Sequence, residues 1–286
     1  MRTPIDFGPG SKLGRFKIEK QLRSCSHTDV FLARDEGGAE VELEVTRTKV
    51  TPDFAAQTGI SAIPPLEPHP NVVRVLGTGF DEKTRAGWCA FDPSSGPTLP
   101  EVVRASGTLE VRRALSIVWQ TLAGLDALQR AGHVLAPTPK DVLVSPDGAN
   151  DRVRLRLVDE EWAASYPGFT AQQVNPNPPA HHYVPPEILN RGALTPATSV
   201  YAAGGLLYLC VTGQAPFVGR DSDSVLEAVC REKPRAPSSL RPGITPEVES
   251  AILEALEKDP AKRPPDPRAF AARLRTAGGT DSWRKA

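Results

Sequence analysis

Short apolar runs separated by polar turns fill the first third of the chain, over residues 16–92. Val41, Leu43 and Val45 alternate with Glu42 and Glu44, which is the two-residue period of a strand that buries one face. The pattern predicts a small, mostly β part that begins near residue 15.

A different period governs the rest of the chain. Within residues 99–131 apolar side chains recur every three or four positions, at Leu115, Val118, Trp119, Leu122, Leu125 and Leu128. This spacing predicts a helix with one face toward a core. Residues 200–275 return to helical spacing, while 165–181 are rich in Pro, Asn and Gln. The sequence therefore predicts a larger helical part after the β part.

Composition limits the function classes. The 286 residues contain 34 basic and 34 acidic side chains, so no net field attracts nucleic acid or an anionic membrane. The four cysteines have no CxxC spacing, which favours packed thiols in a reducing compartment over metal ligands. No apolar run reaches the roughly 18–20 residues that span a bilayer, and residues 1–14 lack the apolar region of a signal peptide. These features predict a cytoplasmic protein.

Several motifs occur in a familiar order. They are residues 16–22, 29–35, 69–73, 138–144, 157–159, 183–187, 200–217 and 258–264. Together they resemble a bacterial Ser/Thr protein kinase domain over residues 15–275. The resemblance implies an α+β, two-lobed fold with a mostly β N-lobe at about 15–92 and a larger α-helical C-lobe at about 97–275. Residues 1–14 are then expected to be a flexible leader and 276–286 a polar tail.

Departures from the family pattern begin at the glycine-rich loop. Only glycine lets the backbone lie close over phosphates, yet Arg23, Cys25 and Thr28 occupy the three expected glycine positions. The stretch reads either as an ordinary polar hairpin or as a place where Arg23 or His27 meets another anion.

The third strand of the family pattern differs in charge. Glu44 stands where the resemblance places a phosphate-pairing lysine, and strand alternation puts Glu42 on the same face. Like unit charges about 4 Å apart repel by roughly 4 kcal/mol at an effective dielectric constant of about 20, so this face would oppose a polyphosphate. A solvated strand face is the alternative reading.

Helix C, which should follow, is expected to be shortened. Residues 52–66 contain no glutamate to pair with a lysine, and Gly59, Pro64 and Pro65 interrupt a long helix.

The expected catalytic and metal positions are also altered. The catalytic aspartate falls on Ala136 or Pro137, neither of which accepts a proton. The metal-binding Asp-Phe-Gly reads Asp159, Glu160 and Glu161. Asp141, in place of an asparagine, is a weak metal candidate together with Asp159, because oxygen ligands suit Mg²⁺. A capping role for Asp141 and a hydrogen-bonded strand-end carboxylate for Asp159 are the alternatives.

Structural positions are kept. Glu187 and Arg263 match the two residues that form a buried salt bridge in this family. Ser199 replaces the aspartate that braces the catalytic loop, and the sequence suggests that no such loop is left to brace.

These departures predict a pseudokinase that is not an enzyme and has no catalytic residue, nucleotide site, metal or cofactor. It would act as a protein-binding scaffold or allosteric regulator in Ser/Thr kinase signalling. The expected partner is a protein, either an active kinase or its substrate, with ATP, nucleic acid and membrane excluded. Residues 175–179 and the helix C region are the candidate docking surfaces. The alternative is an atypical nucleotide-dependent phosphotransferase or nucleotidyltransferase with a rearranged site around Asp159 and Asp141.

Overall fold

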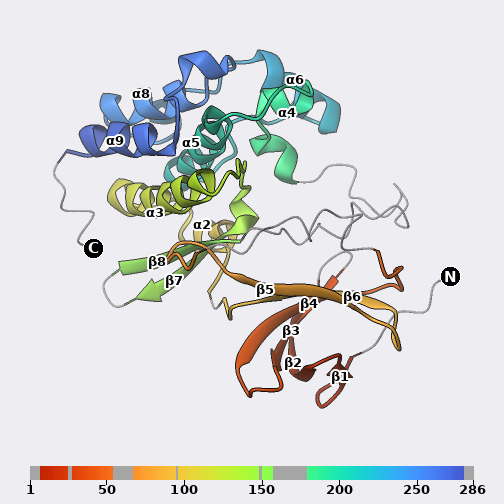
Figure 1. Cartoon of the computed structure of the whole chain (residues 1–286). Coiled ribbons are helices and arrows are strands. Elements are labelled where there is room, and N and C mark those ends of the chain that lie inside the picture. The colour runs from red at the N-terminus through yellow and green to blue at the C-terminus, as the bar shows by residue number, and fades with distance from the viewer. Residues whose placement is uncertain are drawn as a thin grey trace. The chain divides into compact units, whose positions relative to one another are not determined.

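The computed structural model describes residues 7–24, 28–53, 67–94, 96–147, 150–156 and 179–279. The chain forms two compact units (Figure 1). Among the described residues, the first unit contains 7–24, 28–53, 67–68, 73–94 and 156. The second contains 69–72, 96–147, 150–155 and 179–279.

The first unit is built on an antiparallel sheet with the strand order β1-β2-β3-β4-β6-β5. Its strands are β1 (Lys12–Leu13), β2 (Phe16–Ser24), β3 (Thr28–Arg34), β4 (Glu40–Thr46), β5 (Val75–Asp81) and β6 (Ala86–Phe91). Sequential strands pair as hairpins, except that β6 inserts between β4 and β5. Figure 1 shows these strands curling around one another.

The core of this unit forms from the apolar side chains of alternating strand positions. Phe16, Ile18, Phe31 and Leu43 are buried there. Phe7 joins the same cluster, with its ring 6.1 Å from that of Phe31 in an edge-on contact. Residues 7–14 are therefore not a flexible leader, because Phe7 is in the core and β1 pairs with β2.

The second unit is helical apart from one hairpin. Its helices are α2 (Leu99–Ser106), α3 (Val111–Arg130), α4 (Pro186–Leu189), α5 (Pro196–Thr212), α6 (Ser222–Arg231), α7 (Pro237–Leu240), α8 (Pro246–Ala255) and α9 (Pro267–Ala277). Short 3-10 turns are η2 (Pro139–Asp141), η5 (Pro179–Tyr183) and η6 (Pro260–Lys262). The hairpin consists of β7 (Val142–Asp147) and β8 (Asn150–Leu155).

Helix α5 is the centre of this unit. Its residues from Ala197 to Thr212 are all buried, as expected for a helix that is apolar around its whole circumference. Helices α3, α8 and α9 pack against it. A Cβ atom added at Gly204 would lie 2.7 Å from the Cβ of Ala255, so glycine is what permits the close approach of α5 and α8.

The expected stripe of α3 is largely buried. Leu115, Val118, Leu122 and Leu125 lie in the core, but Trp119 is only half-buried. Taken together, a mostly β N-terminal part and a larger helical part confirm the predicted α+β class. The prediction of a shortened helix C concerns residues 54–66, which lie outside the described part of the chain.

Candidate functional site

The two acids of β4 are buried. Glu42 is 2% exposed and Glu44 is 1% exposed, and the apolar residues that alternate with them are buried as well. The strand is thus covered on both faces, and the reading of a solvated acidic face is wrong. Glutamate is almost never fully buried unless it is paired, so the partners of these carboxylates define the chemistry of the strand.

Glu42 has three partners among the described residues. Its Oε1 accepts a hydrogen bond from Arg23 of β2, at 2.8 Å, and another from the guanidinium of Arg156. Its Oε2 accepts from the backbone N–H of Ser94, at 3.2 Å, and from the Ser94 hydroxyl, at 2.5 Å. We call Glu42, Arg23, Ser94 and Arg156 the Glu42 cluster. Arg23 and Arg156 neutralise the buried Glu42 carboxylate, and the hydrogen bonds from Ser94 replace those that water would make.

Arg156 is the buried cation of this cluster. Its side chain is 2% exposed, whereas that of Arg23 is 32% exposed. The guanidinium also lies 6.0 Å from the centre of the Phe91 ring, within cation–π range. The sequence analysis did not identify Arg156 or Ser94. The sequence pattern gave no signal for Arg156, because it continues the polar positions of Arg152 and Arg154, which are exposed and half-buried.

Glu44 is held by a different group. Its Oε1 accepts a hydrogen bond of 2.6 Å from the hydroxyl of Thr28, which is itself fully buried. On the adjacent strand Glu44 pairs with Cys89. Burial raises the pKa of the Cys89 thiol well above its usual value, and the charge of Glu44 adds to this effect while Arg156 opposes it. Cys89 is therefore a protonated core thiol.

Two of the expected glycine positions meet these acids. The hairpin of β2 and β3 pairs Arg23 with Val30 and Ser24 with Asp29. From opposite sides of the turn, Arg23 reaches Glu42 and Thr28 reaches Glu44. The anion that Arg23 meets is thus a carboxylate of the chain itself. Cys25, the third position, and His27 lie outside the described residues.

The second unit contains the expected catalytic-loop positions. Ala136 is half-buried and Pro137 is buried, and neither has a titratable group. Asp141 is 6% exposed, and its Oδ2 accepts from the backbone N–H of Thr138 at 2.7 Å and from its hydroxyl at 2.9 Å. Asp141 therefore caps the turn η2. Across the described ranges, no group of three or more His, Cys, Asp or Glu is arranged to hold a metal ion.

Ser199 contacts the same loop. Its hydroxyl donates a hydrogen bond of 2.5 Å to the backbone carbonyl of Leu135, one residue before Ala136. We expected Ser199 to make no contact with the catalytic-loop segment, and this is wrong. Its hydroxyl hydrogen bond connects the buried start of α5 to the loop that contains Leu135 and Ala136.

Glu187 and Arg263 form a buried ion pair in the second unit. The Nη1 and Nη2 of Arg263 donate to the two carboxylate oxygens of Glu187 at 2.7 and 2.9 Å. The remaining N–H groups of Arg263 donate to the carbonyls of Glu257, Ala197 and Lys258. All five guanidinium donors thus have acceptors. Burial alone would raise the pKa of Glu187. The hydrogen bonds and charge of Arg263, together with hydrogen bonds from the backbone and from Thr198, outweigh burial, so the pKa lies below its usual value.

Other predicted positions lie outside the described residues. These are Asp159, Glu160 and Glu161, the segment 54–66 and residues 175–178 of the expected docking surface. In the part of the chain that the structure describes, no helix has both the length and the apolar character required to cross a membrane.

Comparison with known proteins finds relatives that match most of the chain. The family model for the protein kinase domain matches residues 42–273. A probable serine/threonine-protein kinase of Streptomyces coelicolor is 28% identical over 87% of this chain and 38% of its own length. Serine/threonine-protein kinase PknB of Mycobacterium tuberculosis is 26% identical over 89% of this chain and 41% of its own. This chain thus spans about two fifths of the length of these relatives.

Solved structures agree on the fold. The kinase domain of Mycobacterium tuberculosis PknI superposes with a TM-score of 0.72 at 18% identity, covering 95% of this chain and 100% of that one. The two-lobed kinase-like α+β fold is confirmed.

The same comparisons correct one expectation. The sequence departures predicted that the chain is not an enzyme, but the matching family model and the relatives named as Ser/Thr protein kinases point to a family of enzymes. The similarity extends over most of the chain, so it places the chain in this family despite the altered residues at the family's catalytic positions.

Proposed function

The chain belongs to the protein kinase domain family, and from that membership we propose that it acts in bacterial Ser/Thr kinase signalling by binding another protein. The partner would be a kinase of the same pathway or one of its substrates. In this role the domain serves as a scaffold or an allosteric regulator.

One observation carries the proposal. Glu42 and Glu44 occupy the strand where the family resemblance places a phosphate-pairing lysine, and both are engaged by the chain's own side chains. Arg23 and Thr28, at expected glycine positions, provide two of these contacts. Side chains at these positions therefore stabilise the sheet unit itself, which suits a domain whose outer surface makes the functional contacts.

The frame of the helical unit supports the same role. The Glu187–Arg263 pair and the Ser199–Leu135 hydrogen bond join segments far apart in sequence. Such contacts hold a surface in one shape, and a preformed surface binds a protein with less loss of conformational entropy.

The test is isolation of the tagged chain from cells that encode it, followed by a binding measurement with each purified candidate. The proposal expects a kinase or a kinase substrate that binds the purified chain in a defined stoichiometry without added ATP. If no isolated protein binds the purified chain, the proposal is wrong.

A second function is phosphoryl transfer with a rearranged site, and the names of the relatives favour it. The buried Arg156 and the partly exposed Arg23 are two cations next to the strand that resembles the lysine strand of kinases. Cations that reach transferring phosphoryl groups are the main requirement of such chemistry. Asp141 and Asp159 remain the candidates for a divalent ion in this reading.

Phosphoryl transfer has its own test. Purified chain, Mg²⁺ and labelled ATP are incubated with a generic acceptor protein, and the label on either protein is measured. Loss of label with Asp159→Ala, and retention with the surface variant Arg104→Ala, would support this function. Absence of label with the wild-type chain would contradict it.

A further inference from the structure

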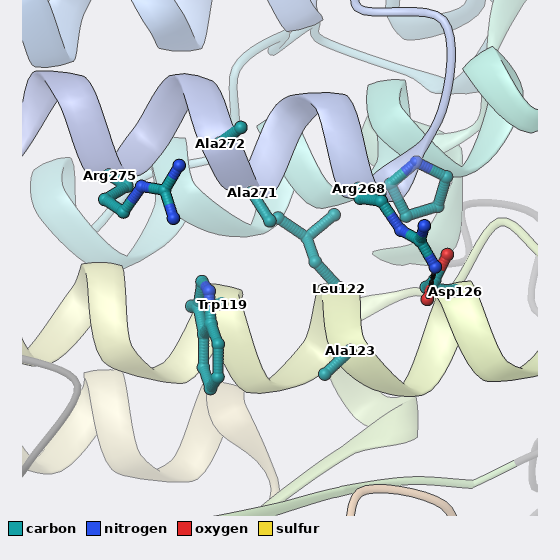
Figure 2. A pocket seen from close by; sticks show the side chains of 9 residues that line it. Trp119, Leu122, Ala123, Asp126, Arg268, Ala271, Ala272 and Arg275 are labelled. Carbon is teal, nitrogen blue, oxygen red and sulfur yellow. Dashed lines mark hydrogen bonds and ion pairs between the residues drawn. The ribbon is translucent and has the colours of Figure 1, made fainter.

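A pocket of about 440 Å³ lies between α3 and α9 of the helical unit (Figure 2). Its size falls within the range of pockets that hold small ligands or a few protein side chains. Neither Glu187 nor Arg263 lines it, and no residue in its lining was among the predicted site residues.

Short side chains create the pocket. Leu122 of α3 points toward Ala271 of α9 (Figure 2), and Ala123 and Ala272 also line the pocket. Helices normally fill the space between them with ridges of side chains that enter opposing grooves. Alanines on both helices leave that space partly empty, so an apolar side chain from elsewhere has room to enter.

The two ends of the pocket differ in charge. At one end Arg268 of α9 pairs with Asp126 of α3, at 3.3 Å. At the other end lie Arg275 of α9 and Trp119 of α3 (Figure 2). Both helices advance seven residues between the two ends, which is about 10 Å at the rise of an α-helix. Since the numbering runs in opposite directions, α3 and α9 are antiparallel here.

Positive charge exceeds negative charge at the pocket. Asp126 pairs with both Arg130, at 3.2 Å, and Arg268, at 3.3 Å, whereas Arg275 is exposed and makes no ion pair with any residue in the described ranges. Positive charge thus remains at the Trp119 end, next to an apolar floor. A ligand that matches both features has an acidic group and an apolar group separated by less than the length of the pocket.

We propose that this groove docks a segment of a partner protein that inserts an aliphatic side chain between Leu122 and Ala271 and pairs an acidic side chain with Arg275. The inference rests on the proposed protein-binding function and names the partner's chemistry. The apolar anchor supplies most of the affinity, and the acid sets the orientation and excludes basic segments.

The test uses an array of short fluorescent peptides, each with one leucine and one glutamate at varied spacing, and a matched array with lysine in place of glutamate. Binding to the full chain is measured by fluorescence anisotropy. We expect some glutamate peptides to bind and their lysine counterparts to bind at least about tenfold more weakly. Higher salt should reduce this difference.

Three variants assign the binding to the groove. Arg275→Glu should weaken the glutamate peptides by about tenfold and strengthen their lysine counterparts. Arg104→Glu is the matched control, because Arg104 is also an exposed arginine in the last turn of a helix, and it should change neither. Ala271→Leu, which fills the pocket, should abolish binding of both arrays while the thermal midpoint shows that the chain stays folded.

Each other result overturns the inference. No binding by any peptide, equal binding of the two arrays, or equal effects of Arg275→Glu and Arg104→Glu would show that the groove does not dock an acidic segment. A native partner that binds the wild type and Arg275→Glu equally would sink this inference alone, since protein binding would stand. If the chain binds no protein at all, the proposed function itself fails.

Discussion

Arg263 and Glu187 form two parallel hydrogen bonds, 2.7 and 2.9 Å long, between residues 76 positions apart in the chain. Arg263 is 4% exposed and Glu187 9%. The pair joins the short helix α4 to the segment between α8 and α9, and the same guanidinium donates to three backbone carbonyls. One side chain therefore organises several segments of the helical unit.

Arg263→Met should lower the free energy of unfolding by about 3–5 kcal/mol, because it leaves a buried carboxylate without its counter-ion. Urea denaturation of the full chain gives this value. Arg268→Met is the control, since Arg268 is a largely exposed arginine whose ion pair contributes at most about 1 kcal/mol. Equal losses for the two variants would contradict the role given to Arg263.

The Glu187 pair should also make stability depend on pH. Burial raises the pKa of Glu187, but the hydrogen bonds and charge of Arg263, with further hydrogen bonds from the backbone and Thr198, hold the folded-state pKa below its usual 4.5. A lowered carboxyl pKa stabilises the fold at pH values above 4.5, and this contribution is lost as pH falls through the folded-state pKa. The stability difference between wild type and Glu187→Gln should be largest above pH 4.5 and shrink below it. Urea titrations at several pH values measure this, and a difference that grows toward acid would refute it.

The Glu42 cluster predicts a coupled pair in the sheet unit. Arg156→Met should cost about 3–5 kcal/mol, because among the described residues Glu42 then keeps one cation, the partly exposed Arg23. The double variant Glu42→Leu/Arg156→Met should recover much of this loss, since no buried charge is stranded. A double-mutant cycle measures the coupling. Arg34→Met, on the exposed side of the same sheet, is the control and should cost less than about 1 kcal/mol.

Cysteine reactivity offers an independent check on burial. Burial raises the pKa of Cys210 to about 12, with Arg113 opposing the shift. Burial also raises the pKa of Cys89. Near neutral pH both should resist alkylation until the chain unfolds, whereas the half-buried Cys230 should react before either of them. Mass spectrometry after timed labelling reads each site, and rapid labelling of Cys210 in the native chain would contradict the packing.

Local patterns were enough to predict the elements. The alternation at Val41, Leu43 and Val45 predicts a strand, and β4 includes it. The helical spacing at Leu115, Val118 and Leu122 predicts α3. Both patterns depend only on neighbours in the sequence, which a single chain displays directly.

Long-range partners could not be predicted in this way. Glu42 was expected on a solvated face of its strand, but it is buried in an ion pair with Arg156, which lies 114 residues away in the sequence. Phe7 was assigned to a leader, although it completes the core through Phe31. The Trp119 position fits the stripe of α3 but lies at a pocket that only the packing of α9 creates. In each case the decisive neighbour is distant in sequence and close in space.

The most direct test of the proposed function is quantitative binding between the purified chain and the proteins isolated with it from cells that encode it, measured with and without Mg²⁺ and ATP. The account predicts that a Ser/Thr kinase or one of its substrates binds with a defined stoichiometry and with an affinity that does not require ATP. The account is contradicted if none of these proteins binds the purified chain while the chain transfers phosphate from ATP to a protein acceptor.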